Sequence, residues 1–318
     1  MSRLTTARAR GAAGRRRTAL RIVVSVVVLL AVAVWLGVGA MAAGRLTVPQ
    51  RRFEPASHPG TFGASEWRER TLTTRDGISL AAWYLPVDGA DVGIVLVHGH
   101  EQSRTWEMRQ RFPELAVALQ AGGYQVVVMD LRGHGASGGE RFSFGRLERF
   151  DVMAAVDLLV AEGVPPGRVG VLGVSMGAAS AIGATADDAR IGALWADSGY
   201  ADIRPILEAR WPGASGLPMV FFYGTLLAHR LRFGYPIDGV VPEVEIRGVH
   251  PRPIQLVHGT ADTVIPYEHG RRLAAASGAD LWTIEGGDHR DGFVNDPAGY
   301  TARVVAFFDA AVRGEPLR

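Results

Sequence analysis

The stretch that decides the fold is VGVLGVSMGAASAIGA, residues 169–184. Its first six residues form a short apolar run, which is typical of a strand buried on both faces of a parallel sheet. Glycines at 173 and 177 flank Ser175, where they let a strand and a helix pack closely around a strained turn. We therefore predict that Ser175 stands at the carboxyl edge of a sheet as a nucleophile. The alternative is a serine that only caps the next helix.

Strand-like and helix-like segments alternate on both sides of this stretch. An opening hairpin is expected from residues 71–74 and 80–85, around the turn at Asp76 and Gly77. Further strands are expected at 93–97, 125–129, 191–196, 253–257 and 280–284, and helices at 105–120, 149–161, 176–186, 268–276 and 298–312. Such alternation predicts an α/β fold with a mainly parallel sheet flanked by helices.

The alternation is interrupted between residues 200 and 250, where two apolar helical segments are expected at 203–211 and 217–231. An insertion after the sixth strand falls at the carboxyl edge of the sheet, where open α/β folds bind ligands. We predict a small helical lid whose Phe221 and Phe222 line the substrate pocket. The alternatives are that these aromatic side chains only pack the insertion onto the body, or that they dip into the membrane interface.

A serine nucleophile needs a base, and the expected chain order is nucleophile, acid and histidine. His289 follows a predicted strand in the loop EGGDH, whereas His269 falls in a predicted helix, so we favour His289. Asp262 follows another predicted strand and is the expected acid, which would orient the imidazole. Asp197, after the sixth strand, is the alternative acid.

A developing oxyanion requires preorganised N–H donors. We expect these from the backbone of Met176, directly after the nucleophile, and of His100 in the turn HGHEQ at 98–102. The histidines of this turn lack further ligands at metal-binding spacing, so no metal site is expected. The chain has no cysteine, which excludes a thiol nucleophile and disulfides. Chemistry of this kind needs no organic cofactor.

Basic charge is concentrated at the N-terminus. Seven of the 34 arginines lie in the first 21 residues, which leaves 27 arginines against 32 acidic residues in the remainder, a formal charge of −5. A net-acidic body argues against binding of nucleic acid.

An uncharged run of 23 residues, 22–44, follows the arginines and is long enough to cross a bilayer as a helix. The basic flank is expected in the cytoplasm, which places the body outside the cell membrane on a single-pass anchor. The alternative is a signal peptide cut near Ala40-Met41-Ala42, which would make the protein secreted. We expect a tail at 1–21, the anchor at 22–44, a linker at 45–67 and the main domain at 68–318, with the lid at 200–250.

Four motifs occur in order along the chain: VHGH at 97–100, DLRGHGAS at 130–137, GVSMG at 173–177, and HGTAD at 258–262 with His289. From Glu69 to Val312 the chain resembles the α/β-hydrolase superfamily. It is most similar to the serine aminopeptidase and monoacylglycerol-lipase-like branch and to membrane-anchored hydrolase-domain proteins. The resemblance implies that residues 130–137 form a turn that shapes the site.

The combined interpretation is a membrane-tethered serine hydrolase that cleaves a small acyl substrate through an acyl-enzyme. Carboxylic esters are the favoured substrates, and a peptidase or thioesterase is the alternative within the same class. The turn HGHE differs from the glycine-rich run of some lipases, which argues against activity on large lipids. A noncatalytic binding protein that kept the fold is the alternative from another class.

Overall fold

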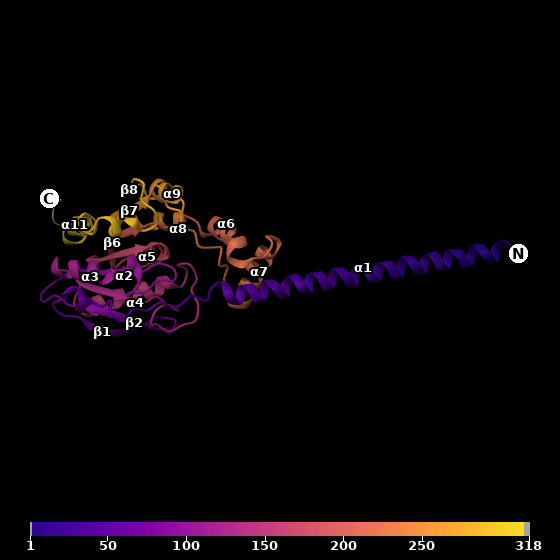
Figure 1. The fold of residues 1–318 in the computed structure, drawn as a ribbon, viewed down its shortest axis with the longest axis horizontal. Coiled ribbons are helices and arrows are strands. Elements are labelled where there is room, and N and C mark those ends of the chain that lie inside the picture. Colours follow the sequence, from indigo (N-terminus) through magenta and orange to yellow (C-terminus); the bar gives the residue numbers. More distant parts are fainter. Residues whose placement is uncertain (1, 315–318) are drawn as a thin grey trace. The chain divides into compact units, whose positions relative to one another are not determined.

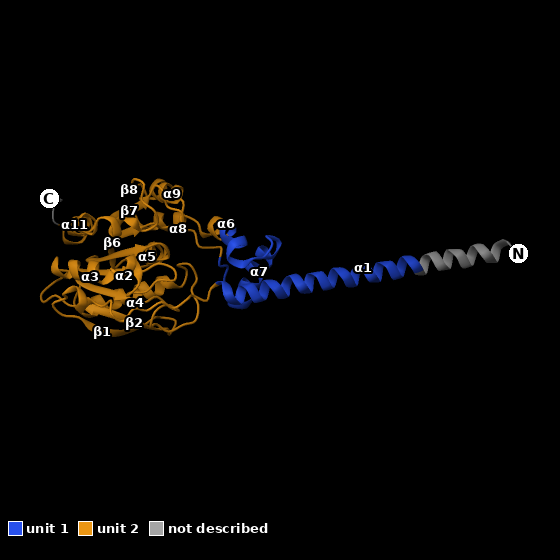
Figure 2. Ribbon diagram, viewed as in Figure 1, with its two compact units in different colours: residues 1–46, 208–237 blue, residues 47–207, 238–318 orange. Residues whose placement is uncertain are grey.

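The computed structural model describes the backbone of residues 2–314 and the side chains of residues 16–314 (Figure 1). The side chains of four arginines in the predicted basic tail lie outside these described residues: Arg3, Arg8, Arg10 and Arg15. The chain divides into two compact units (Figure 2). We call Met1–Leu46 with Glu208–Ile237 the helical unit, and Thr47–Leu207 with Asp238–Arg318 the sheet unit.

The sheet unit contains one eight-stranded sheet with the order β1-β2-β4-β3-β5-β6-β7-β8. β1 and β2 form the predicted hairpin, β2 pairs antiparallel with β4, and all other neighbours are parallel. The predicted mainly parallel α/β sheet is therefore confirmed. The strands are β1 (Arg68–Thr73), β2 (Ser79–Leu85), β3 (Gly93–Val97), β4 (Gln125–Met129), β5 (Val169–Val174), β6 (Ile191–Asp197), β7 (Ile254–Gly259) and β8 (Leu281–Ile284).

Two buried apolar clusters hold helices on the two faces of the sheet. In β5, Val171 points into one cluster with α4, α5 and α9, and Leu172 points into the other with α2, α3, α10 and α11. Both faces are covered, which explains why the central strands are apolar without alternation. These helices, with the short α8, are α2 (Glu107–Gln110), α3 (Phe112–Ala121), α4 (Glu148–Ala161), α5 (Met176–Asp187), α8 (Pro242–Glu245), α9 (Glu268–Ser277), α10 (Asp291–Asn295) and α11 (Pro297–Phe308).

The single helix predicted at 105–120 is wrong, because the chain forms α2 and α3 instead. Met108 and Arg109 have left-handed backbone angles, with φ of 52° and 55°, which interrupt the helical hydrogen bonds. Pro113 lies in the first turn of α3. Proline is tolerated there because the first N–H groups of a helix have no partner within it.

The helical unit contains α1 (Ser2–Leu46), the end of α6 (Ile203–Ser215) and α7 (Val220–Phe233). From Arg16 to Leu46, α1 is long and apolar enough to cross a membrane, and a signal sequence has the same properties. The two helices predicted in the insertion are confirmed.

Candidate active site

Ser175 lies at the sharp turn between β5 and α5, with a φ of 56° and a ψ of −117°. A β-carbon at Gly173 would lie 2.2 Å from the carbonyl oxygen of Gly177, and one at Gly177 would lie 2.4 Å from that of Val97. Only glycine fits at both positions, so the two glycines permit the strained backbone that turns the serine toward the edge of the sheet.

The structure brings the three predicted residues Ser175, His289 and Asp262 together. His289 Nε2 lies 3.0 Å from Ser175 Oγ, and His289 Nδ1 lies 2.7 Å from Asp262 Oδ2. An ionised carboxylate only accepts hydrogen bonds, so Nδ1 carries the proton and Nε2 is free to accept one from the serine. This is the geometry that general-base activation of a hydroxyl requires.

Asp262 is fixed at the end of β7. Its Oδ1 accepts hydrogen bonds from the backbone N–H groups of Val264 and Ile265, at 2.8 and 2.7 Å. His258 Nε2 lies 3.3 Å from its Oδ2. Burial would raise the pKa of Asp262, but the hydrogen bonds from His258 and His289 outweigh burial and hold the pKa well below its ordinary value. Asp262 is therefore ionised at neutral pH.

The alternative acid and the alternative histidine have other partners. Asp197 accepts hydrogen bonds from the hydroxyls of Ser198 and Tyr300, both at 2.8 Å. Burial raises the pKa of Asp197, and these two bonds oppose the effect only in part. His269 Nδ1 accepts the backbone N–H of Ala201 at 3.1 Å. Asp197 and His269 are therefore held by hydrogen bonds to residues at or after the end of β6 and, for Asp197, to Tyr300 of α11.

The turn after β3 is held rigidly. Gly99 donates its N–H to Glu107 Oε2 at 2.8 Å, and His98 Nε2 accepts the N–H of Leu131 at 2.9 Å. Because Nε2 accepts, the proton of His98 is on Nδ1, which donates to the carbonyl oxygen of Gly99 at 2.7 Å. Met176 is the first residue of α5, where backbone N–H groups lack partners within the helix. His100 follows Gly99 directly in this turn.

Two residues absent from the predicted set connect this turn to the histidine loop. Glu107 is fully buried and accepts hydrogen bonds from Gly99 and from the guanidinium of Arg290, the latter at 2.9 Å. Burial would raise the pKa of Glu107, but the charge of Arg290 and the backbone N–H donors outweigh it and lower the pKa. Arg290 adjoins His289, and its N–H also donates to Ser198 Oγ at 3.2 Å. The sequence offers no signal for this pair except the position of Arg290 beside the histidine.

The segment at 130–137 forms a tightly bonded turn in the sheet unit. Asp130 Oδ1 accepts the N–H of Arg104 at 2.7 Å, and its Oδ2 accepts the N–H of Ala136 at 2.9 Å. The Arg132 guanidinium pairs with the buried Asp151 carboxylate at 2.7 Å. These bonds fit the structural role that the resemblance implies.

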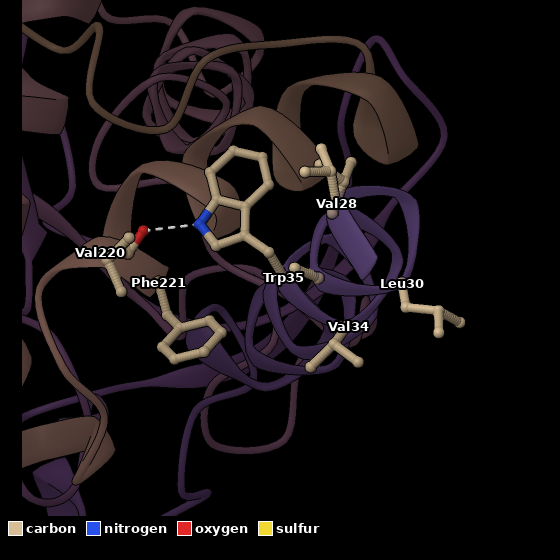
Figure 3. A pocket seen from close by; sticks show the side chains of 8 residues that line it. Val28, Leu30, Val34, Trp35, Val220 and Phe221 are labelled. Carbon is tan, nitrogen blue, oxygen red and sulfur yellow. Dashed lines mark hydrogen bonds between the residues drawn. The ribbon is translucent and has the colours of Figure 1, made fainter. Parts of the chain in front are cut away.

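Phe221 and Phe222 lie in the helical unit, on α7. The ring of Phe222 is buried, with its centroid 5.5 Å from that of Trp211. Phe221 lines an apolar groove together with side chains of α1 (Figure 3). The role of these two residues in a substrate pocket stays a prediction.

The sequence pattern of the alpha/beta hydrolase family matches residues 94–304. The chain belongs to this family. The uncharacterized protein YfhR of Escherichia coli K12 is 28% identical over 268 residues, covering 79% of this chain and 84% of that protein. The uncharacterized protein Rv2307c of Mycobacterium tuberculosis H37Rv is 30% identical over 214 residues, covering 66% of this chain and 67% of that protein.

Among solved structures, the chain is similar to the esterase Pf2001 of Pyrococcus furiosus, with a TM-score of 0.68 and 23% identity. The match covers 83% of this chain and 99% of the esterase. It is also similar to the esterase RhEst1 of Rhodococcus sp. ECU1013, with a TM-score of 0.54 and 22% identity, covering 76% of this chain and 99% of that one. These similarities establish the fold.

Proposed function

We propose that the protein is a serine hydrolase that cleaves carboxylic esters through an acyl-enzyme. The observation that supports this most directly is the continuous path of hydrogen bonds from Ser175 through His289 to Asp262, at 3.0 and 2.7 Å. The names of the two solved esterases with the same fold favour an ester as substrate. The family contains other chemistries, so the site rather than the fold supports the proposal.

In the first half of the reaction, Ser175 Oγ attacks the ester carbonyl carbon while its proton passes to His289 Nε2. Asp262 stabilises the imidazolium and keeps its orientation. The N–H groups of Met176 and His100 are the proposed donors to the tetrahedral oxyanion. His289 then protonates the departing alkoxide, and the acyl group remains on the serine.

In the second half, water enters where the alcohol left. His289 takes a proton from this water as it attacks the acyl carbon, and returns the proton to Ser175 Oγ when the acid departs. The net reaction consumes one ester and one water and produces one alcohol and one carboxylic acid. The protein residues supply every proton transfer.

The test is active-site labelling of the full chain in membranes. A fluorophosphonate should label Ser175 covalently, and Ser175→Ala should abolish labelling without changing the amount of protein. A panel of nitrophenyl esters, thioesters and aminoacyl amides then separates an esterase from a thioesterase or peptidase. Absence of covalent labelling in folded protein would favour a noncatalytic binding protein.

We further propose that α1 anchors the protein, with the sheet unit outside the cytoplasm. The length of the apolar run supports a membrane-spanning helix, and the arginines before it support this orientation. Protease added to intact spheroplasts should digest the sheet unit and spare the N-terminal tail. A mature N-terminus near Ala43 would show a cleaved signal, and full protection of the body would place it in the cytoplasm.

A further inference from the structure

Within the helical unit, α7 packs against α1 at backbone distance. A β-carbon at Gly39 would lie 2.7 Å from the carbonyl carbon of Gly224, and one at Gly224 would lie 2.9 Å from the ring of Trp35. Trp35 Nε1 donates a hydrogen bond to the carbonyl oxygen of Val220 at 2.8 Å (Figure 3). Close approach through small residues is how helices associate in lipid, where apolar side chains gain little by leaving their surroundings.

The contacts run in the same direction along both helices. Trp35 meets Val220 and Gly39 meets Gly224, and a β-carbon at Gly44 would lie 3.4 Å from the guanidinium of Arg232. At 1.5 Å per residue, the stretch from Trp35 to Gly44 is about 13 Å long, close to half of the ~30 Å hydrocarbon core. If α1 crosses a bilayer, α7 therefore lies beside its outer half.

The outer face of α7 is apolar and exposed. Val220, Tyr223 and Leu227 are 58%, 50% and 43% exposed, and their spacing places them in a stripe on one face of the helix. The same helix, α7, also forms one side of the groove, whose other side consists of exposed apolar side chains of α1 (Figure 3). An exposed apolar face of this kind usually contacts a partner or a membrane. If α1 spans a membrane, lipid surrounds it and is available to contact the neighbouring face of α7.

The segment that contains most of α7 and the end of α6 has no charged residue. No charged residue occurs from Trp211 to His229, a run of 19 residues bracketed by Arg210 and Arg230. Arginines at both ends suit a hairpin that enters and leaves a leaflet from the same side, because their long side chains reach the headgroups.

Several polar groups at the tip of the hairpin are paired within it. The N–H of Leu217 donates to Ser215 Oγ at 3.1 Å, and this hydroxyl donates to the carbonyl oxygen of Trp211 at 2.6 Å. Trp211 Nε1 donates to the carbonyl oxygen of Pro218 at 3.3 Å. Backbone inside a bilayer must be paired in this way, because hydrocarbon offers no partner.

We propose that residues 211–229 form a re-entrant membrane hairpin, packed on α1 in the outer leaflet, whose exposed stripe and groove are covered by lipid acyl chains. The inference rests on the proposed anchor, but not on the proposed ester chemistry. Continuity with α1 favours lipid over a soluble partner, since an aqueous partner would have to reach a face beside a membrane-spanning helix.

The absence of cysteine allows a direct test, because any single cysteine is a unique labelling site. Leu227→Cys would probe the stripe, Val28→Cys the exposed α1 side of the groove, and Val244→Cys in α8 an exposed apolar position of the sheet unit. Tyr223→Cys is a second probe of the stripe if the first variant does not fold. Each full-length protein would be labelled with an environment-sensitive fluorophore and reconstituted into phosphatidylcholine vesicles.

Two quenchers then locate each fluorophore: phosphatidylcholine with brominated acyl chains reports lipid, and aqueous iodide reports water. We expect Leu227→Cys to match Val28→Cys, with strong quenching by brominated lipid and protection from iodide, and Val244→Cys to show the reverse. The proposal is overturned if Leu227→Cys instead matches Val244→Cys. It is also overturned if neither quencher reaches this position, since that would mean a second copy or another protein covers the stripe.

Iodide quenching at Val28→Cys would show that α1 itself is outside the bilayer, and would remove both the anchor and the hairpin. Fluorophosphonate labelling of Ser175 in the same vesicles reports the proposed chemistry separately. Failure of that chemistry is therefore distinguishable from failure of the hairpin.

Discussion

Glu107→Gln should impair both stability and turnover, although Glu107 is outside the proposed catalytic set. The carboxylate accepts the N–H groups of Gly99 and Met108, both at 2.8 Å, and the guanidinium of Arg290 at 2.9 Å. Glutamine has nearly the same shape, but its amide nitrogen cannot accept a hydrogen bond. At least one of these donors then loses its partner in a fully buried place.

The expected magnitude follows from this loss of one acceptor. A buried donor left unpaired costs about 1–3 kcal/mol. The lost charge adds less than about 1 kcal/mol, because the side chain of Arg290 is 28% exposed and its pairing is weakened by water. We expect destabilisation of about 1–4 kcal/mol in total. Loss of one oxyanion donor costs about 10²–10³ in kcat, so a turn that is loosened but retained should cost about 10-fold to 100-fold.

The assay combines urea unfolding with nitrophenyl ester kinetics, at a temperature where the variant is fully folded. Asp309→Asn is the matched control, because Asp309 accepts from Tyr124 and Arg313 and contacts none of the proposed site residues. It should lose stability and keep kcat. Glu107→Gln with kcat within twofold of the parent and lowered stability would refute the idea that this carboxylate positions the turn.

Four further results are expected. Ser175→Ala and His289→Ala should each remove nearly all ester turnover, and the double variant should be little worse, because the two act as a unit. Asp262→Asn should lower kcat strongly by changing the histidine tautomer, whereas Asp197→Asn should do much less. Because the pKa of Asp262 is lowered in the folded state, the ionised carboxylate stabilises the fold above its unfolded pKa of about 3.9, and this stabilisation is lost as the pH falls toward the folded value. In Asp262→Asn, the free energy of unfolding measured with urea should therefore depend less on pH in the acid range. Phe221→Ala should change the preference between short and medium acyl esters if Phe221 lines the pocket, by about 1–3 kcal/mol per methylene; an unchanged profile would exclude that role.

The elbow could be predicted from the sequence because local backbone sterics dictate it. The glycines at 173 and 177 are required by contacts within a few residues or with the neighbouring strand, and the apolar run before them reflects burial on both faces. The candidate base and acid could be predicted from chain order. Each of these signals depends on short stretches of sequence.

The break between α2 and α3 could not be predicted in this way. Helical periodicity continues across residues 105–120, although Met108 and Arg109 inside α2 have left-handed backbone angles that a single regular helix cannot contain. Glu107 is held in place by Arg290, which is 183 residues away in the chain. A single buried carboxylate among helix-forming residues looks like an exposed helix position until its distant partner is known.

The position of α7 shows the same limit with a larger consequence. An apolar helix inside an insertion predicts only that some apolar surface covers it, and a substrate pocket, the body of the protein or a membrane interface would each provide such a surface. The decisive contacts join Gly39 to Gly224, and Trp35 to Val220, across 185 residues. A glycine in each of two helices carries little information alone. It indicates close packing only when the structure shows that the backbone of another helix occupies the space of its missing side chain. The paired glycines help to place Glu208–Ile237 in the same compact unit as α1, and the proposed lipid surroundings of α1 would then explain the apolar stripe of α7.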